Sequence, residues 1–198
     1  MIYDHYKETC SIVRDSIKFR DRLMLFVIIT LAFFSFQSFF PITSNQVVSE
    51  LLTFKLGLNL QFNFAFLGSI IWFLLLIFVL RYFQTAVYIE RQYKYIHNLE
   101  EQLNKEFKED IITREGKSYL SKYPLFSDWM CFLYTIFFPI LLFLITLLKI
   151  ISELINSHGV ISVNIVIDTI IFLILSISIF LYVKMLHFDG KKKGDDEI

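Results

Sequence analysis

Four long apolar runs, separated by gaps that are alternately rich and poor in basic residues, constrain this chain most strongly. Each run is close to the ~20 residues that an α-helix needs to cross ~30 Å of hydrocarbon. The runs are Leu23–Pro41, Asn63–Leu80, Trp129–Leu148 and Val160–Val183. All but two of the 19 basic residues lie in the N-terminal segment, the middle gap or the C-terminal tail; the exceptions are Lys55 and Lys149. By the positive-inside rule, these three segments are cytoplasmic, so the chain crosses the membrane four times with both termini inside.

Composition leads to the same fold class. Hydrophobic residues make up 56% of the 198-residue chain, charged residues 19%, and the mean hydropathy is +0.58. A soluble domain of this size could not hide so much apolar surface, so lipid must act as part of the solvent. The abundance of Phe, Ile, Lys and Asn is typical of an AT-rich bacterial genome. We therefore predict an all-α, four-pass transmembrane helical bundle in a bacterial inner (plasma) membrane, with the second helix extended into the cytoplasm.

The chain divides into five predicted segments. They are a cytoplasmic amphipathic segment (1–22), transmembrane helices 1 and 2 with an external loop (23–87), a cytoplasmic helical extension with a return segment (88–128), transmembrane helices 3 and 4 (129–186) and a cytoplasmic tail (187–198). The first segment, with apolar Ile12, Ile17 and Phe19, either lies along the inner surface or acts only as a flanking cap that sets topology. The loop at 42–62 is too apolar to be fully solvated, which predicts a short helix that ends at Gly57.

The second span does not stop at the membrane boundary. No Gly or Pro occurs between Gly68 and Gly116, so the sequence predicts one helix from about Asn63 to Phe107. Beyond the bilayer, apolar residues recur at heptad spacing and form a stripe that consists of Ile89, Ile96, Leu99, Leu103 and Phe107. We predict that this stripe mediates homo-oligomerisation or binds a cytosolic protein; the alternative is a hairpin that packs on itself. Further candidate contact residues are Arg91, Tyr93, Arg114, Lys117 and Tyr119.

Asp168 is the strongest candidate for intramembrane chemistry. It lies about eight residues into the fourth run, where an ionisable group costs several kcal/mol unless it is paired, protonated or hydrated. Asn164 lies one turn away, and Gln37 in the first run lies at a compatible depth. No basic residue within the runs neutralises Asp168. It either gates or lines an ion or proton path in an oligomer, or it is a neutral aspartic acid that hydrogen-bonds a neighbouring helix.

Two sequence features predict the geometry of the third and fourth runs. Pro139 follows two phenylalanines inside the third run, which predicts a kink at that point. The connection Ile150–Gly159 is short, so these two helices should be antiparallel neighbours.

The sequence gives little support for an enzymatic function. The four histidines show no metal-binding spacing, the two cysteines form no framework, and no nucleophile elbow, P-loop or zinc-protease motif occurs. We therefore predict no catalytic residues, no metal and no cofactor. The lysines of the tail are followed by acidic residues, which indicates a topology signal rather than direct nucleic-acid binding.

The segment Ile112–Trp129, flanked by a long charged helix and a Phe-rich third run, resembles small four-pass bacterial membrane proteins of anti-phage defence islands. The layout is similar to that of the KwaA family, the membrane subunits of the Kiwa defence system, in length, four passes, internal termini and a cytoplasmic extension. In outline it resembles the four-pass accessory protein of type VI-B CRISPR systems about as well. The Kiwa resemblance implies an inner-membrane homo-oligomer, with a tetramer favoured, that senses phage attack and works with a cytosolic partner, KwaB, which acts on phage DNA processes.

The leading prediction is a non-enzymatic sensor or scaffold that couples a membrane event to a cytosolic effector. The alternative is an oligomeric pore or ion channel that depolarises the membrane, with Asp168 and Asn164 lining the path. An enzyme that acts on lipid is a third, weaker class.

Overall fold

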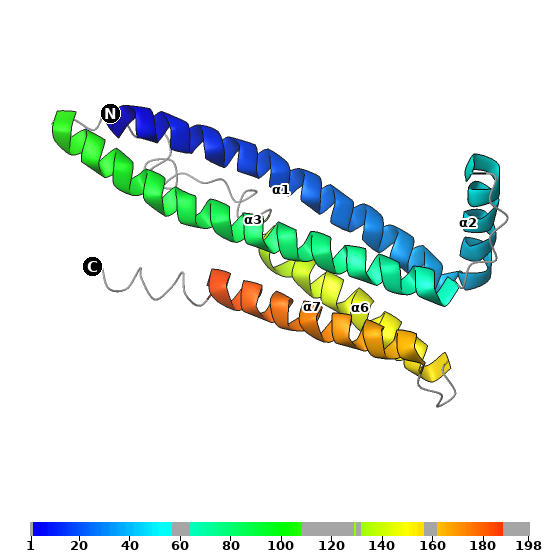
Figure 1. The fold of residues 1–198 in the computed structure, drawn as a ribbon. Coiled ribbons are helices and arrows are strands. Elements are labelled where there is room, and N and C mark those ends of the chain that lie inside the picture. The colour runs from blue at the N-terminus through cyan, green and yellow to red at the C-terminus, as the bar shows by residue number, and fades with distance from the viewer. Residues whose placement is uncertain (1, 57–63, 108–128, 130–131, 157–161, 188–198) are drawn as a thin grey trace. The chain divides into compact units, whose positions relative to one another are not determined.

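Every element that the structure describes is a helix (Figure 1). The computed structural model describes residues 2–56, 64–107, 129, 132–156 and 162–187. Its elements are α1 (Ile2–Phe39), α2 (Pro41–Leu56), α3 (Phe64–Phe107), the π-helical turn η1 (Leu133–Phe137), α6 (Phe138–Asn156) and α7 (Val163–His187). The predicted all-α fold is confirmed.

Four helices among the described residues are long and apolar enough to cross a membrane. They are Ile2–Phe39, Gly68–Lys105, Leu133–Ile155 and Val163–Leu186. Large apolar side chains such as Leu148, Ile177 and Phe180 are exposed on the last two, as expected for surfaces that face lipid. The chain is therefore a multi-pass membrane protein, as its four apolar runs predict.

Two of these helices are much longer than a bilayer requires. α3 has 44 residues and begins and ends within one residue of the predicted bounds. At 1.5 Å per residue it is about 66 Å long, roughly twice the thickness of the hydrocarbon. α1 has 38 residues, because the predicted N-terminal segment and the first span form one continuous helix.

The chain divides into two compact units, and α1 and α3 contribute to both. The extension unit comprises residues 1–24 and 81–133, and the membrane unit comprises residues 25–80 and 134–198. In α1 the boundary follows the charged stretch that ends at Arg22, and in α3 it falls between Leu80 and Arg81. The division thus coincides with the change from charged to apolar sequence.

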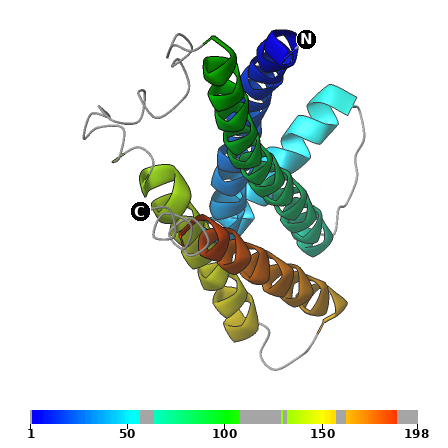
Figure 2. The same ribbon diagram turned by 90° about the vertical axis from the view of Figure 1, so that its left-hand side faces the viewer.

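In the extension unit, the first part of α1 packs antiparallel against the last part of α3 (Figures 1 and 2). Val13 of α1 is buried with Ile89 and Ile96 of α3. Tyr6, Cys10 and Ile17 pack against this core from α1. Tyr6, Cys10, Val13 and Ile17 are spaced by four, three and four residues, the spacing that aligns one helix face with a heptad stripe on its neighbour.

This packing differs from the predicted amphipathic helix on the membrane surface. Of the three apolar residues on which that prediction rested, Ile17 packs on the core, whereas Ile12 and Phe19 are exposed. The face of α1 that packs against α3 consists of the residues at heptad spacing, because only these can contact the stripe of α3 along its length.

In the membrane unit, aromatic side chains connect α1 to α3. Phe26 stacks on Phe78 with ring centroids 5.6 Å apart, and Phe34 meets Trp72 edge-on at 4.7 Å. Such pairs contribute about 0.5–1.5 kcal/mol beyond the area they bury. Trp72 is completely buried.

The helices α6 and α7 are antiparallel neighbours, as their short connection predicts (Figure 1). Leu142 and Thr146 of α6 and Leu175 of α7 are completely buried. Phe143 stacks on Phe172 at 5.9 Å. The buried Thr146 hydroxyl donates to the backbone oxygen of Leu142, so no hydroxyl donor remains unsatisfied there.

The sequence makes predictions about three local features: the region around Pro139, the first external connection and the end of the third helix. The π-helical turn η1 ends two residues before Pro139, a residue without the N–H that a regular helix would use. The kink at Pro139 stays a prediction. A helix, α2, occupies Pro41–Leu56 in the predicted external loop and ends before Gly57. The third helix, however, continues to Asn156 instead of ending near Leu148.

Candidate functional site

A cluster of polar side chains lies within the membrane unit, contributed by three helices. It consists of Ser69 from α3, Lys149 and Glu153 from α6, and Asp168 from α7. The Lys149 Nζ atom lies 2.9 Å from Glu153 Oε1, and their side chains are only 14% and 22% exposed. The two residues are four positions apart, so they project from the same helix face one turn from each other.

Asp168 is the most deeply buried member of this cluster, at 3% exposure. The Ser69 hydroxyl lies within hydrogen-bonding reach of its carboxyl group. The Glu153 carboxyl lies within hydrogen-bonding reach, and Lys149 is close enough to interact with Asp168 electrostatically. Asp168 Oδ1 is buried without a hydrogen-bond partner among the described residues.

Aromatic side chains border the cluster. The Lys149 ammonium lies 5.8 Å from the centroid of the Phe34 ring, which in turn packs edge-on against Trp72. A cation over an aromatic face gains about 0.5–2 kcal/mol, more where water is excluded. Phe34 therefore helps to hold Lys149 within the bundle instead of letting it extend to the membrane surface.

The prediction that Asp168 has no basic counterpart is corrected by this geometry. Ending the third span at Leu148 placed Lys149 and Glu153 at or beyond the membrane edge, whereas α6 continues through both. The available signal was the spacing of four between Lys149 and Glu153 directly after an apolar run, which predicts an ion pair on one more turn of helix. Nothing in the sequence around Ser69 predicted that it would lie beside Asp168.

The two predicted companions of Asp168 are placed differently. Gln37 of α1 is half-buried beside Gly68, where a Cβ atom would lie 3.5 Å from Gln37 Nε2. It is thus adjacent in space to the residue that precedes Ser69. Asn164 is half-buried one turn before Asp168 on α7.

The predicted contact stripe is buried within the extension unit. Ile89, Ile96, Leu99 and Leu103 are each at most 6% exposed. Ile89 and Ile96 are covered by α1, so that part of the stripe needs no second chain to cover it. This differs from its predicted role as an oligomerisation or docking face, and the reason is that the N-terminal segment supplies the complementary heptad face.

The other predicted contact residues fall into two groups. Arg91 and Tyr93 are exposed on α3. Phe107 ends α3, and Arg114, Lys117 and Tyr119 lie outside the described residues, as does most of the segment Ile112–Trp129.

A polar contact also joins α1 to α3 within the extension unit. The Tyr6 hydroxyl of α1 donates to Glu100 Oε1 of α3 at 3.0 Å, and Glu100 is buried. Burial and the neighbouring Glu100 carboxylate raise the pKa of the Tyr6 phenol, so the hydroxyl stays protonated and can donate.

We expect Tyr6→Phe to loosen the pairing of α1 with α3 by about 1–3 kcal/mol, because a buried carboxylate loses a donor. Hydrogen exchange of the backbone amides in residues 2–24 would measure the change. The matched control is Tyr3→Phe, at an exposed tyrosine on the same helix. Equal exchange in Tyr6→Phe and the wild type would show that this hydrogen bond does not hold the unit together.

The described residues contain no group of three or more His, Cys, Asp or Glu side chains that could hold a metal ion. The cluster in the membrane unit instead offers an ammonium, two carboxyl groups and a hydroxyl, which can exchange protons and ion pairs. No protein family, curated protein or solved structure matches the chain.

Proposed function

We propose that the chain is a non-enzymatic sensor or scaffold of a bacterial inner membrane, with both termini in the cytoplasm. It would couple an event at the membrane to a cytosolic effector protein. The layout that resembles the Kiwa membrane subunits favours a role in anti-phage defence and assembly as a homo-oligomer, with four copies favoured. The distribution of basic residues supports the orientation.

The observation that carries this proposal is the continuity of α1 and α3. α3 supplies Ser69 to the polar cluster of the membrane unit and Ile96 to the core of the extension unit, in one uninterrupted helix. α1 likewise supplies Phe34 to one unit and Val13 to the other. A continuous helix transmits displacement and rotation along its axis, so a change among the membrane helices would reach the extension.

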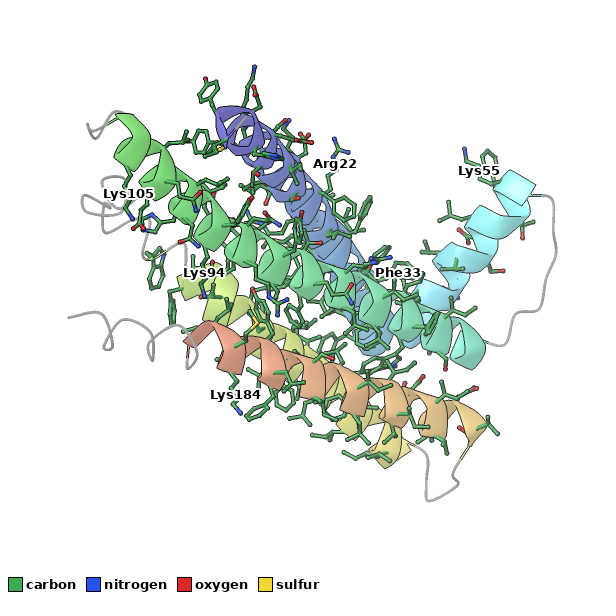
Figure 3. All side chains as sticks on the ribbon, turned by 60° about the vertical axis from the view of Figure 1, so that its left-hand side comes forward. Arg22, Phe33, Lys55, Lys94, Lys105 and Lys184 are labelled. Atoms are coloured by element: carbon green, nitrogen blue, oxygen red, sulfur yellow. The ribbon has the colours of Figure 1, made fainter. Side chains whose placement is uncertain are left out.

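The effector would bind the exposed face of the extension, because the apolar stripe is internal. Arg91, Lys94 and Tyr95 are exposed on α3, and Figure 3 shows Lys94 and Lys105 on this part of the helix. Exposed arginine and tyrosine side chains are the types enriched at protein interfaces.

The test is affinity purification of the full-length chain from its native host in mild detergent, with native mass measurement. We expect a stoichiometric soluble protein that is lost in the variant Arg91→Glu/Lys94→Glu, together with protection against phage. The control is Lys55→Glu, an exposed lysine on α2 (Figure 3), which should keep both. A bare homo-oligomer, or a partner that both variants retain equally, would contradict the proposal.

A pore is the second candidate, and the charged cluster within the spanning helices favours it. The expected result is a conductance of the purified chain in planar lipid bilayers that Asp168→Asn abolishes. A chain that binds its partner and leaves bilayers electrically silent would exclude the pore.

A further inference from the structure

The polar cluster of the membrane unit does not balance its own charge. It contains one ammonium, Lys149, and two carboxyl groups, Glu153 and Asp168. With all three ionised, the cluster carries one net negative charge. The side chains that lie beside it on α3 and α1, Ser69 and Phe34, are neutral. Asn164, one turn before Asp168 on α7, is also neutral.

No other charged side chain described in this unit is placed to supply the missing positive charge. Glu50 and Lys55 lie on α2, and Lys184 lies near the end of α7 (Figure 3). All three are exposed, whereas Asp168 is 3% exposed. Among the described residues the cluster thus keeps an uncompensated charge, which is costly within a membrane-spanning bundle and favours the binding of one further cation.

Two buried oxygens indicate which cation this is. Glu153 Oε2 and Asp168 Oδ1 are both buried and lack a hydrogen-bond partner among the described residues. The two carboxyl groups nevertheless lie within hydrogen-bonding reach of one another. Ionised carboxylates can only accept hydrogen bonds, so two of them in contact repel, whereas one proton converts the contact into a hydrogen bond.

We propose that Glu153 and Asp168 form a binding site for a single proton, which they share. The proton comes from water, bonds to one oxygen of one carboxyl group, and is donated to an oxygen of the other. Lys149 neutralises the remaining negative charge through Glu153 Oε1, and the Ser69 hydroxyl lies within hydrogen-bonding reach of Asp168. The occupied cluster is electrically neutral.

A metal ion fits this site less well than a proton. The Lys149 ammonium already occupies one Glu153 oxygen and would repel a second cation nearby. Na⁺ or Ca²⁺ would also require several oxygen ligands, and the described residues provide no group of three acidic, histidine or cysteine donors. A proton needs only the two oxygens that lack partners.

This site and the partner-binding face on the extension unit share no residue, so the two proposals can be tested separately. Its occupancy sets the charge between α3, α6 and α7, so release of the proton would place a net negative charge among three packed helices. Loss of the partner in the purification experiment would therefore leave this inference standing, and the reverse also holds.

The test is infrared spectroscopy of the full-length chain in lipid nanodiscs at neutral pH, with exchange from H₂O into D₂O. We expect one protonated carboxyl group per chain, seen as a carbonyl stretch that shifts on deuteration. Both Asp168→Asn and Glu153→Gln should abolish this band, because each leaves a single carboxylate whose charge the Lys149 ammonium balances. Glu50→Gln is the matched control and should retain the band.

Each other outcome overturns the proposal. Absence of the band in the wild type would mean that both carboxyl groups are ionised, and this measurement needs no variant. Loss of the band in only one of the two cluster variants would mean that one residue holds the proton alone. Disappearance of the wild-type band when Na⁺ or Ca²⁺ replaces a bulky organic cation in the buffer would identify a metal site.

Discussion

Lys149→Met is expected to destabilise the membrane unit strongly. It leaves Glu153 and Asp168 without their only cationic neighbour in the described part of the unit. Removing one partner of a buried ion pair typically costs about 3–5 kcal/mol, because the other charge remains buried and unpaired. The Lys149 stem also loses its position over the Phe34 ring. The measurement is the fraction of monodisperse protein that remains in detergent after heating to a series of temperatures.

The control for this prediction is Lys55→Met, which removes an exposed lysine from α2 and should melt as the wild type does. A rescue separates charge from packing. The triple variant Lys149→Met/Glu153→Gln/Asp168→Asn carries no charge in the cluster and should recover most of the lost stability, because neutral replacement of a buried ionic group is often tolerated. A Lys149→Met protein that melts with the wild type would show that the carboxylates are solvated.

Bilayer physics explains why the outline of the fold could be predicted from sequence. Hydrocarbon allows only elements that satisfy their own backbone, so a long apolar run must be a helix. The extent of α3 followed from the lack of Gly and Pro after Gly68, and the observed helix ends at Phe107 as predicted. The helix α2 could be expected because its apolar residues do not suit a solvated loop.

The partners of Asp168 could not be predicted by treating the first charge after an apolar run as the end of the span. Lys149 and Glu153 neutralise each other one turn apart, so the helix continues through them to Asn156. Their proximity to Asp168 also depends on how α6 and α7 pack, and packing depends on side-chain shapes that a hydropathy pattern does not contain.

The pairing of α1 with α3 was missed for a different reason. The prediction considered the apolar residues of 1–22 against a membrane surface and did not compare their spacing with the stripe of α3. Tyr6, Cys10, Val13 and Ile17 have that spacing, and α1 uses them. The signal was present in the sequence, but it involves two segments more than 70 residues apart, whose proximity follows from the antiparallel course of the first two spans.

Ile96→Ala is expected to open the extension unit. Ile96 is 1% exposed and forms the core with Val13 and Ile89. Truncating a buried isoleucine typically costs about 2–5 kcal/mol. The described core cluster around Ile96 holds only two other buried side chains, Val13 and Ile89, so amide exchange in residues 2–24 should become ~30-fold faster or more. Hydrogen exchange with mass spectrometry measures this unit separately from the membrane unit, whose exchange should not change.

Tyr95→Ala is the matched control, because it truncates an exposed side chain at the adjacent position of the same helix. It should leave exchange in residues 2–24 unchanged. The pair Val13→Ala and Ile96→Ala tests the contact itself: the double variant should cost less than the sum of the single variants, since each already removes their shared packing. Additive costs would mean that the two residues stabilise the helices separately. Unchanged protection in Ile96→Ala would mean that α1 and α3 are held together by something other than this core, and the exposed face proposed for the effector would need to be redefined.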